Sequence, residues 1–204
     1  MNNIKAVVFD CDGVMFDSQQ ANIAFYNRVL DYFGEPAVTP SQSERVHLCH
    51  TASSPQVFAG LLGSARVEAA LDFSQQLGYE QFIPQLQAEP GLFDALAQLS
   101  AHFSLAVATN RGSSMAKILD FFDMDGSFHH VLTYLDVARA KPCPDMLYAV
   151  AERLHLAPDQ MMFVGDSEFD RRAAKSAGCH FVSYKWDGGL RIDHHSQLAQ
   201  LLQL

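Results

Sequence analysis

The chain has 204 residues, 49% of them hydrophobic, so it can bury a substantial core, and 14 basic against 23 acidic side chains give a formal net charge of −9. This negative field repels polyanions, which argues against nucleic-acid binding but permits a small anion held by a local cation or metal. No apolar run reaches the roughly 18 residues of a membrane span, and the first residues lack a signal-peptide core, so we expect a cytoplasmic protein with no membrane contact.

The first predicted element is a strand over residues 4–10 (IKAVVFD), a β-branched run typical of a strand buried on both faces. Two carboxylates, Asp10 and Asp12, stand at its end. Carboxylates this close repel each other unless a cation lies between them or one keeps a proton, and either state suits catalysis. In the alternative interpretation the two acids only cap a turn, with Asp12 and Gly13 supplying ordinary turn chemistry.

The next stretch, residues 17–86, shows helical periodicity and no convincing strand. One helix is predicted to begin at Ser18 and end at Gly34, and a second runs over residues 54–63 with Ser54 as its cap. A third continues to Gly78. We therefore expect an inserted α-helical cap domain at 17–86, with the α/β core formed by 1–16 and 87–204.

The rest of the chain alternates strands with helices. The helical patterns cover residues 113–124 and 144–156. The predicted strands cover residues 103–110, 129–135, 161–167 and 180–186. This alternation predicts an α/β fold with a doubly wound parallel sheet, whose ligands bind at the carboxyl ends of the strands.

Polar side chains follow two of these later strands. Thr109 and Asn110 offer a hydroxyl and amide donors to a phosphate oxygen near a helix start, although a Thr in an ordinary turn explains them as well. Asp166 and Asp170 are separated by about one helical turn, so both can face one site. Lys141, in the segment KPCPD, is either a cation for that site or an exposed loop lysine.

The ordered set DxDG, TN, KPxPD and GDSxxD resembles the four motifs of the haloacid dehalogenase-like hydrolase superfamily. Within it, the chain is similar to phosphatase-type members with a helical cap, such as phosphoglycolate phosphatase-like and β-phosphoglucomutase-like enzymes. The match extends from Val8 to Asp170. The resemblance implies a Mg²⁺-dependent phosphatase that hydrolyses a small phosphorylated metabolite through an aspartyl-phosphate intermediate.

The resemblance also implies roles for individual residues. Asp10 would be the nucleophile and a metal ligand, and Asp12 would be the general acid and base, with its backbone carbonyl on the metal. Thr109 and Lys141 would bind the phosphoryl group, beside the amide donors of Asn110 inferred above from its position. Asp166 would complete the metal site, and Asp170 would support the metal waters or Lys141.

Two other functions stay open. A phosphomutase of the β-phosphoglucomutase type would use the same motifs, and a non-catalytic module binding a phosphorylated ligand would keep the fold. We favour hydrolysis because residues 34–63 hold no cluster of Lys and Arg for a second phosphate. Retention of all the motif acids argues against the binding module. The sequence does not indicate the substrate or the oligomeric state.

The other histidines and the cysteines receive plain structural interpretations. His47, Cys49 and His50 have no matching metal-ligand pair, so we expect ordinary residues of the helical insertion. The pairs at 129–130 and 194–195 are expected to be partly exposed. Cys11 is expected to fill space away from the two acids, and all four cysteines to be free thiols.

Overall fold

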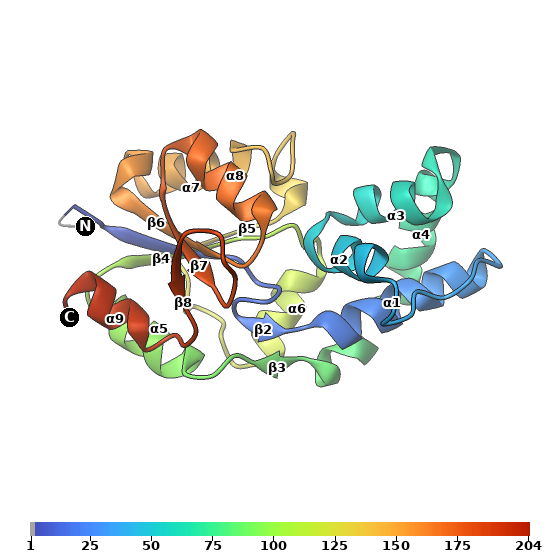
Figure 1. Cartoon of the computed structure of the whole chain (residues 1–204), viewed down its shortest axis with the longest axis horizontal. Coiled ribbons are helices and arrows are strands. Elements are labelled where there is room, and N and C mark those ends of the chain that lie inside the picture. The colour runs from blue at the N-terminus through green and yellow to red at the C-terminus, as the bar shows by residue number, and fades with distance from the viewer. Residues whose placement is uncertain (1–2) are drawn as a thin grey trace.

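The computed structural model describes residues 3–204 and contains one sheet of six strands that pair in parallel (Figure 1). In order across the sheet these are β5 (His130–Leu132), β4 (Ser104–Ala108), β1 (Ala6–Phe9), β6 (Met161–Gly165), β7 (His180–Tyr184) and β8 (Leu190–Ile192). β4 and β5 extend the sheet on one side of β1, and β6 to β8 extend it on the other. Such a reversal of direction opens a crevice at the carboxyl end of the central strand.

Helices cover both faces of this sheet (Figure 1). One face carries α7 (Asp145–Leu154) and α8 (Glu168–Ala177); the other carries α5 (Leu92–Ser100), α6 (Ser114–Phe121) and α9 (Gln197–Leu202). Alternate residues of β1 enter different cores, since Ala6 and Val8 pack with α7 and α8 while Val7 and Phe9 pack on the opposite side. The predicted doubly wound α/β fold is confirmed.

The five predicted strands all exist, with bounds shorter than the sequence patterns, but β8 was not predicted. It follows a turn containing Gly188 and Gly189 at the edge of the sheet. Leu190 and Arg191 are exposed and only Ile192 is buried, so the strand lacks the apolar run that identifies the others.

Residues 19–85, which we call the helical region, extend from one end of the sheet rather than covering its faces (Figure 1). They form α1 (Gln19–Tyr32), α2 (Ser43–Thr51), α3 (Ser54–Leu62), α4 (Val67–Leu77) and the 3₁₀ turns η1 (Ser64–Arg66) and η2 (Glu80–Gln85). Two further 3₁₀ turns, η3 (Tyr134–Asp136) and η4 (Pro158–Gln160), belong to the sheet connections.

The two predicted helix N-caps have different outcomes. At α3 the cap is Ser53 rather than Ser54, because the Gln56 side chain accepts a hydrogen bond from the Ser53 backbone N–H at 3.0 Å in a capping box. Ser18 does stand at the N-cap of α1, but its hydroxyl makes no capping bond and donates to Asp12 instead.

The two crossings between the sheet and the helical region lie side by side. β2 (Phe16–Asp17) and β3 (Gln87–Ala88) form a short antiparallel pair, which the purely helical prediction for residues 17–86 did not anticipate at Asp17. The predicted boundaries of the insertion fall at this pair, and the division into two domains stays a prediction. Residues 1–2 of the predicted core lie outside the described part. No helix among residues 3–204 is both long and apolar enough to cross a membrane.

Candidate active site

The ends of three neighbouring strands bring polar side chains together. Asp10 follows β1, Thr109 follows β4 and Asp166 follows β6. The Asp10 backbone N–H donates to the carbonyl oxygen of Val164 at 2.9 Å, which continues the pairing of β1 with β6 to the point where the site begins. Because parallel strands end at the same edge, side chains about 100 residues apart in the chain converge here.

Lys141 joins two of the predicted acids. Its Nζ lies 2.8 Å from Asp10 Oδ1 and 2.7 Å from Asp170 Oδ1, and its side chain is 1% exposed. A buried ammonium is stable only when paired, and these two carboxylates outweigh the desolvation that disfavours its charge, so the pKa of Lys141 is raised. Burial raises the pKa of Asp10 to about 7, against the opposing effect of Lys141. Lys141 therefore lies within the site and is not an exposed loop lysine.

Asp10, Asp166 and Asp170 form an acidic cluster in which one carboxylate oxygen from each lies within 4.8 Å of the others. Hydrogen bonds at the start of α8 fix the Asp170 side chain. Its Oδ2 accepts one from the Ser167 backbone N–H at 3.2 Å and one from the Ser167 hydroxyl at 2.5 Å. Hard oxygen ligands concentrated in this way suit Mg²⁺. The donor set fits the predicted metal site at Asp10 and Asp166, with Asp170 in a supporting position.

Gly13 permits this approach of the loop after β1 to Asp166. Its φ of 72° lies in the left-handed region, and a Cβ there would stand 1.9 Å from Asp166 Oδ2. Any larger residue would displace the carboxylate. The glycine of the DxDG motif is therefore required by the packing of the acidic cluster as well as by the turn.

Asp12 has a separate set of partners, which we call the Asp12 network: Ser18, Asn22, Tyr79 and Arg111. Its Oδ1 accepts hydrogen bonds from Arg111 Nη2 at 2.6 Å, from Asn22 Nδ2 at 3.0 Å and from the Ser18 hydroxyl. Burial alone would raise the pKa of Asp12, but the charges of Arg111 and His50 and these hydrogen bonds outweigh it, so the pKa is lowered. Asp12 is held as a carboxylate.

The two predicted phosphate-binding residues after β4 have different surroundings. Thr109 is fully buried, and its hydroxyl accepts a hydrogen bond from the Arg111 backbone N–H at 3.1 Å. The Asn110 side chain donates to the carbonyl oxygens of Thr51 at 3.0 Å and Lys141 at 3.1 Å, so it ties the helical region to the loop of Lys141. Its side-chain donors are thus used within the protein, and its role toward phosphate stays a prediction.

His50 contradicts its interpretation as an ordinary residue of the insertion. It lies at the end of α2, and its Nε2 is 3.4 Å from Asp166 Oδ2. Burial lowers the pKa of this imidazole, but the Asp166 carboxylate outweighs it and raises the pKa to about 9. His47 and Cys49 do not join this contact, so the two histidines of HLCH have separate surroundings.

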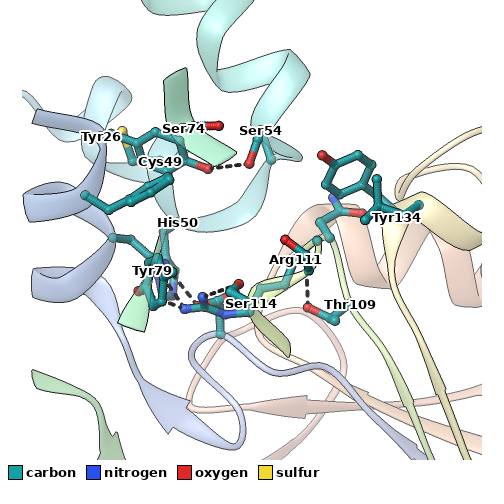
Figure 2. Close-up of a pocket in the computed structure, with 18 of the residues that line it drawn as sticks. Tyr26, Cys49, His50, Ser54, Ser74, Tyr79, Thr109, Arg111, Ser114 and Tyr134 are labelled. Carbon is teal, nitrogen blue, oxygen red and sulfur yellow. Dashed lines mark hydrogen bonds and ion pairs between the residues drawn. The ribbon is translucent and has the colours of Figure 1, made fainter. Parts of the chain in front are cut away.

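A cavity of about 400 Å³ lies between the strand ends and the helical region. Figure 2 shows Thr109, Arg111 and Ser114 at its base, Tyr79 beside the Arg111 guanidinium, and Tyr26 and Ser54 on the opposite wall, where their hydroxyls lie 3.3 Å apart. Asp10 and Asp12 also line it. The two acids of the DxDG motif thus open to a space large enough for a small molecule.

His195 also differs from its prediction. It was expected to be partly exposed, yet it is fully buried, stacks on Tyr184 with ring centroids 4.5 Å apart, and its Nε2 lies 2.7 Å from the Val14 carbonyl oxygen. His194 and His129 are exposed and His130 is half-buried. Cys11 is buried in the core, and all four cysteines are free.

Sequence reasoning did not assign Ser18, Asn22, Tyr79 and His50 to the site. Ser18 carried a signal, but for helix capping. Asn22 lies within an ordinary helical pattern, and Tyr79 follows the predicted helix stop at Gly78. Arg111 was not among the assigned site residues either. These residues reach the site because the helical region packs on the strand ends, and spacing along the chain does not reveal that contact.

Comparison with known proteins identifies the family. The model of the family described as haloacid dehalogenase-like hydrolase matches residues 7–184. A curated phosphoglycolate phosphatase of Escherichia coli O157:H7 is 31% identical, over 94% of this chain and 86% of that protein. The crystal structure of a HAD-superfamily hydrolase from Geobacter sulfurreducens is 37% identical, with a TM-score of 0.85 over 98% of this chain and 100% of that chain.

A third structure shares the fold at lower identity. CbbY from Rhodobacter sphaeroides, solved in complex with phosphate, is 21% identical, with a TM-score of 0.81 over 98% of this chain and 100% of that chain. The family match spans most of the chain and includes all four motifs around the site described above. The chain belongs to the haloacid dehalogenase-like hydrolase family and is one of its phosphatases.

Proposed function

We propose that this phosphatase hydrolyses a monoester of a small phosphorylated metabolite by transferring the phosphoryl group to Asp10. The observation that carries the proposal is the position of Asp10 on the cavity, 8% exposed, with Lys141 Nζ 2.8 Å from its Oδ1. An ionised carboxylate is a competent nucleophile, and the ammonium beside it would offset the charge of an incoming phosphate.

The Asp10 and Asp166 carboxylates and the backbone carbonyl of Asp12 would hold Mg²⁺, with Asp170 in support. When bound, the ion would neutralise phosphate charge and favour the ionised form of Asp10. The carboxylate oxygens of the acidic cluster, all within 4.8 Å of one another, and the close approach that Gly13 allows support this assignment. Without a cation, these acids would repel an anionic substrate.

The reaction would proceed in two steps. In the first, an Asp10 oxygen attacks phosphorus and the bond to the ester oxygen breaks. Asp12, which takes up a proton from solvent when the anionic substrate binds beside it, donates that proton to the departing oxygen. In the second, Asp12 takes a proton from water as that water attacks phosphorus and the bond to Asp10 breaks, which releases inorganic phosphate. Thr109 and Lys141 would bind the phosphoryl oxygens throughout, and Asn110 would join them by exchanging one of its side-chain hydrogen bonds to the protein for one to phosphate.

The substrate class is supported by the relatives, by the cavity and by charge. The E. coli relative is named for phosphoglycolate, and the CbbY structure holds phosphate. A cavity of about 400 Å³ suits a small metabolite, and the net charge of −9 disfavours nucleic acid. The segment 17–86 would act as a cap that limits water around the reacting group. Cytoplasmic residence stays a prediction.

A phosphomutase would need cations to hold a second phosphate. Among the described residues that line the cavity, the helical region supplies neutral and aromatic side chains and His50 but no Lys or Arg. This favours hydrolysis, although Arg111 and Lys117 line the cavity from the sheet side. Incubation with glucose 1-phosphate and Mg²⁺, with and without a bisphosphate primer, distinguishes the two, because a mutase would form glucose 6-phosphate faster than inorganic phosphate.

A panel of phosphate monoesters tests the main proposal. The purified protein with Mg²⁺ should release inorganic phosphate from small alkyl phosphates. Acid quench during turnover should trap one phosphoryl group on the peptide that contains Asp10. Phosphate release without a trapped phosphopeptide, when the quench precedes the second step, would contradict the role of Asp10 as nucleophile.

A further inference from the structure

Arg111 places a charged side chain next to Asp12 although none of the four motifs requires it. It follows Thr109 and Asn110 after β4, its side chain is 6% exposed, and its Nη2 lies 2.6 Å from Asp12 Oδ1. Nη2 also lies 2.9 Å from Asn22 Oδ1 and 3.2 Å from the Tyr79 hydroxyl. A buried guanidinium in this setting is held from several directions.

The other members of the Asp12 network keep Arg111 in that position. The Tyr79 ring lies under the guanidinium, 4.7 Å from its central carbon, and the Tyr79 hydroxyl donates to Asn22 Oδ1 at 2.6 Å. Asn22 in turn donates to Asp12 Oδ1 at 3.0 Å. Asp12, Asn22 and Arg111 thus form a closed set in which each touches the other two.

The contacts fall on one oxygen of Asp12. Within residues 3–204, the side-chain donors to this carboxylate all reach Oδ1. Oδ2 is left for proton exchange, and Asp12 lines the cavity. Two of the donors, Ser18 and Asn22, belong to the start of α1, whereas Arg111 is fixed to the end of a sheet strand, next to the phosphate-binding Thr109.

We propose that Arg111 is the positioning residue of the proton-transfer group: it holds Asp12 by Oδ1 so that Oδ2 faces the ester oxygen of the substrate. The inference rests on the proposed function, in which Asp12 donates a proton to that oxygen. Arg111 acts through Asp12 and does not itself bind the substrate. Nη2 reaches all three acceptors while the flat guanidinium lies over the Tyr79 ring, a stacked position that a lysine ammonium does not reproduce.

This role predicts a dependence on the leaving group. An alkoxide is a poor leaving group and needs the proton from a well-placed Asp12, whereas p-nitrophenolate leaves readily as an anion. Loss of Arg111 should therefore slow the cleavage of alkyl phosphates and spare the first step with p-nitrophenyl phosphate. A merely structural defect would slow both.

The experiment compares Arg111→Gln, Arg111→Lys and wild type with three probes: 2-phosphoglycolate, glycerol 3-phosphate and p-nitrophenyl phosphate, all with Mg²⁺. For Arg111→Gln, kcat with both alkyl phosphates should fall by roughly 100-fold with KM little changed. The pre-steady-state burst of p-nitrophenolate should keep its rate. Arg111→Lys should restore part of kcat. Arg191→Gln, at an exposed arginine of β8, is the matched control and should behave as wild type.

A double variant tests whether Arg111 acts through Asp12. Asp12→Asn with Arg111→Gln should be no slower on alkyl phosphates than Asp12→Asn alone, because the group being positioned is already lost. If Arg111→Gln is poorly folded by circular dichroism, Tyr79→Phe provides the same test, since it removes a hydroxyl from the network and keeps the ring. It should show the same selectivity for alkyl phosphates with a smaller loss.

Three results would overturn the inference. Equal losses with alkyl and aryl phosphates in a folded variant would indicate general damage. A rise in KM confined to 2-phosphoglycolate would make Arg111 a ligand for the substrate carboxylate. Additive losses in the double variant would separate Arg111 from Asp12. A wild-type protein that cleaves none of the three probes would instead contradict the proposed function, and this inference with it.

Discussion

Asp10 and Asp12 are two residues apart, yet the clusters around them are built differently. Asp10 shares one cation, Lys141, with Asp170. Asp10 follows a strand, Lys141 lies in a loop and Asp170 lies in the first turn of α8, so all three belong to the core. Asp12 has Arg111 as its own cation and receives further hydrogen bonds from Ser18 and Asn22 at the start of the helical region. The first cluster is contained in the core, and the second joins the core to the insertion.

The difference separates the proton affinities of the two acids. Burial raises the pKa of Asp10 to about 7, because its single cation is divided with another carboxylate. The pKa of Asp12 is lowered although burial acts on it as well, because donors surround its Oδ1. In the proposed reaction the bound ligands would shift both acids the other way: Mg²⁺ beside Asp10 would favour the ionised nucleophile, and the anionic substrate beside Asp12 would favour the protonated acid.

The largest expected effect comes from removing the charge of Asp10. Asp10→Asn should reduce turnover by at least about a thousandfold, because an amide is a poor nucleophile and a weak metal ligand. The change keeps the side-chain shape, so the circular dichroism spectrum should match wild type. Phosphate release by this variant within about tenfold of the wild-type rate would rule out Asp10 as the nucleophile.

Removal of the metal from the Asp10 cluster should also abolish turnover. Dialysis against chelator followed by assay in excess EDTA should abolish phosphate release, and Mg²⁺ should restore it, since the acids otherwise crowd negative charge against the substrate. Ca²⁺ should restore little, because its larger and looser coordination shell would move phosphorus relative to Asp10. Undiminished activity in EDTA would remove the metal from the mechanism.

Lys141 tests the stability of the first cluster. Lys141→Met should lower the free energy of unfolding by about 3–5 kcal/mol, because it leaves two buried carboxylates without their cation. Urea denaturation with and without Mg²⁺ measures this. Lys185→Met is a partly exposed control with its own carboxylate, Glu89, and should cost less. Equal losses of unfolding free energy in the two variants would mean that Lys141 stabilises the cluster no more than a surface ion pair does.

His195 provides a titrating group outside both clusters. Burial between Phe9 and Tyr184 lowers its pKa to about 4, while the unfolded chain has the ordinary value of 6.5. As the pH falls, the unfolded state therefore binds this proton before the folded state does. The stability that the neutral His195 contributes is complete above pH 6.5 and is lost as the pH falls toward 4. The difference between the two pKa values, about 2.5, corresponds to about 3 kcal/mol in the free energy of unfolding.

His195→Gln isolates this contribution, because the other histidines and the carboxylates, Glu89 among them, titrate in both proteins. Between pH 6.5 and 4, wild type should lose more stability in urea denaturation than the variant, by about 3 kcal/mol. Parallel pH profiles for the two proteins would show that the imidazole accepts a proton without unfolding.

The smallest effect should come from Ser18. Ser18→Ala removes one of the donors to Asp12 Oδ1 and leaves the Asp10 cluster unchanged, so stability should fall by about 1 kcal/mol. The alkyl-phosphate kcat should fall by no more than about tenfold, because Asn22 and Arg111 still hold the carboxylate. A loss as large as that of Arg111→Gln would make Ser18, not Arg111, the residue that positions Asp12.

Much of the core was predictable because its signals are local. Strands such as β1 appear in the sequence as short apolar runs, and Asp10, Thr109 and Asp166 stand directly after them. Parallel strands end at a common edge, so the convergence of these side chains follows from the strand assignments alone. The edge strand β8 escaped because only Ile192 of its residues is buried.

The contacts of the helical region were decided by tertiary structure. The approach of Arg111 to Asp12 joins positions 99 residues apart, and that of Tyr79 to Asn22 joins positions 57 apart. His50 reaches Asp166 through the same packing, whereas His195 becomes buried within the core, against Val14 at a separation of 181 positions. The sequence determined the periodicity, the turns and the residues at each strand end, because these depend on neighbours in the chain. Partners across the two regions depend on how their surfaces fit, and one sequence carries no periodic signal for that.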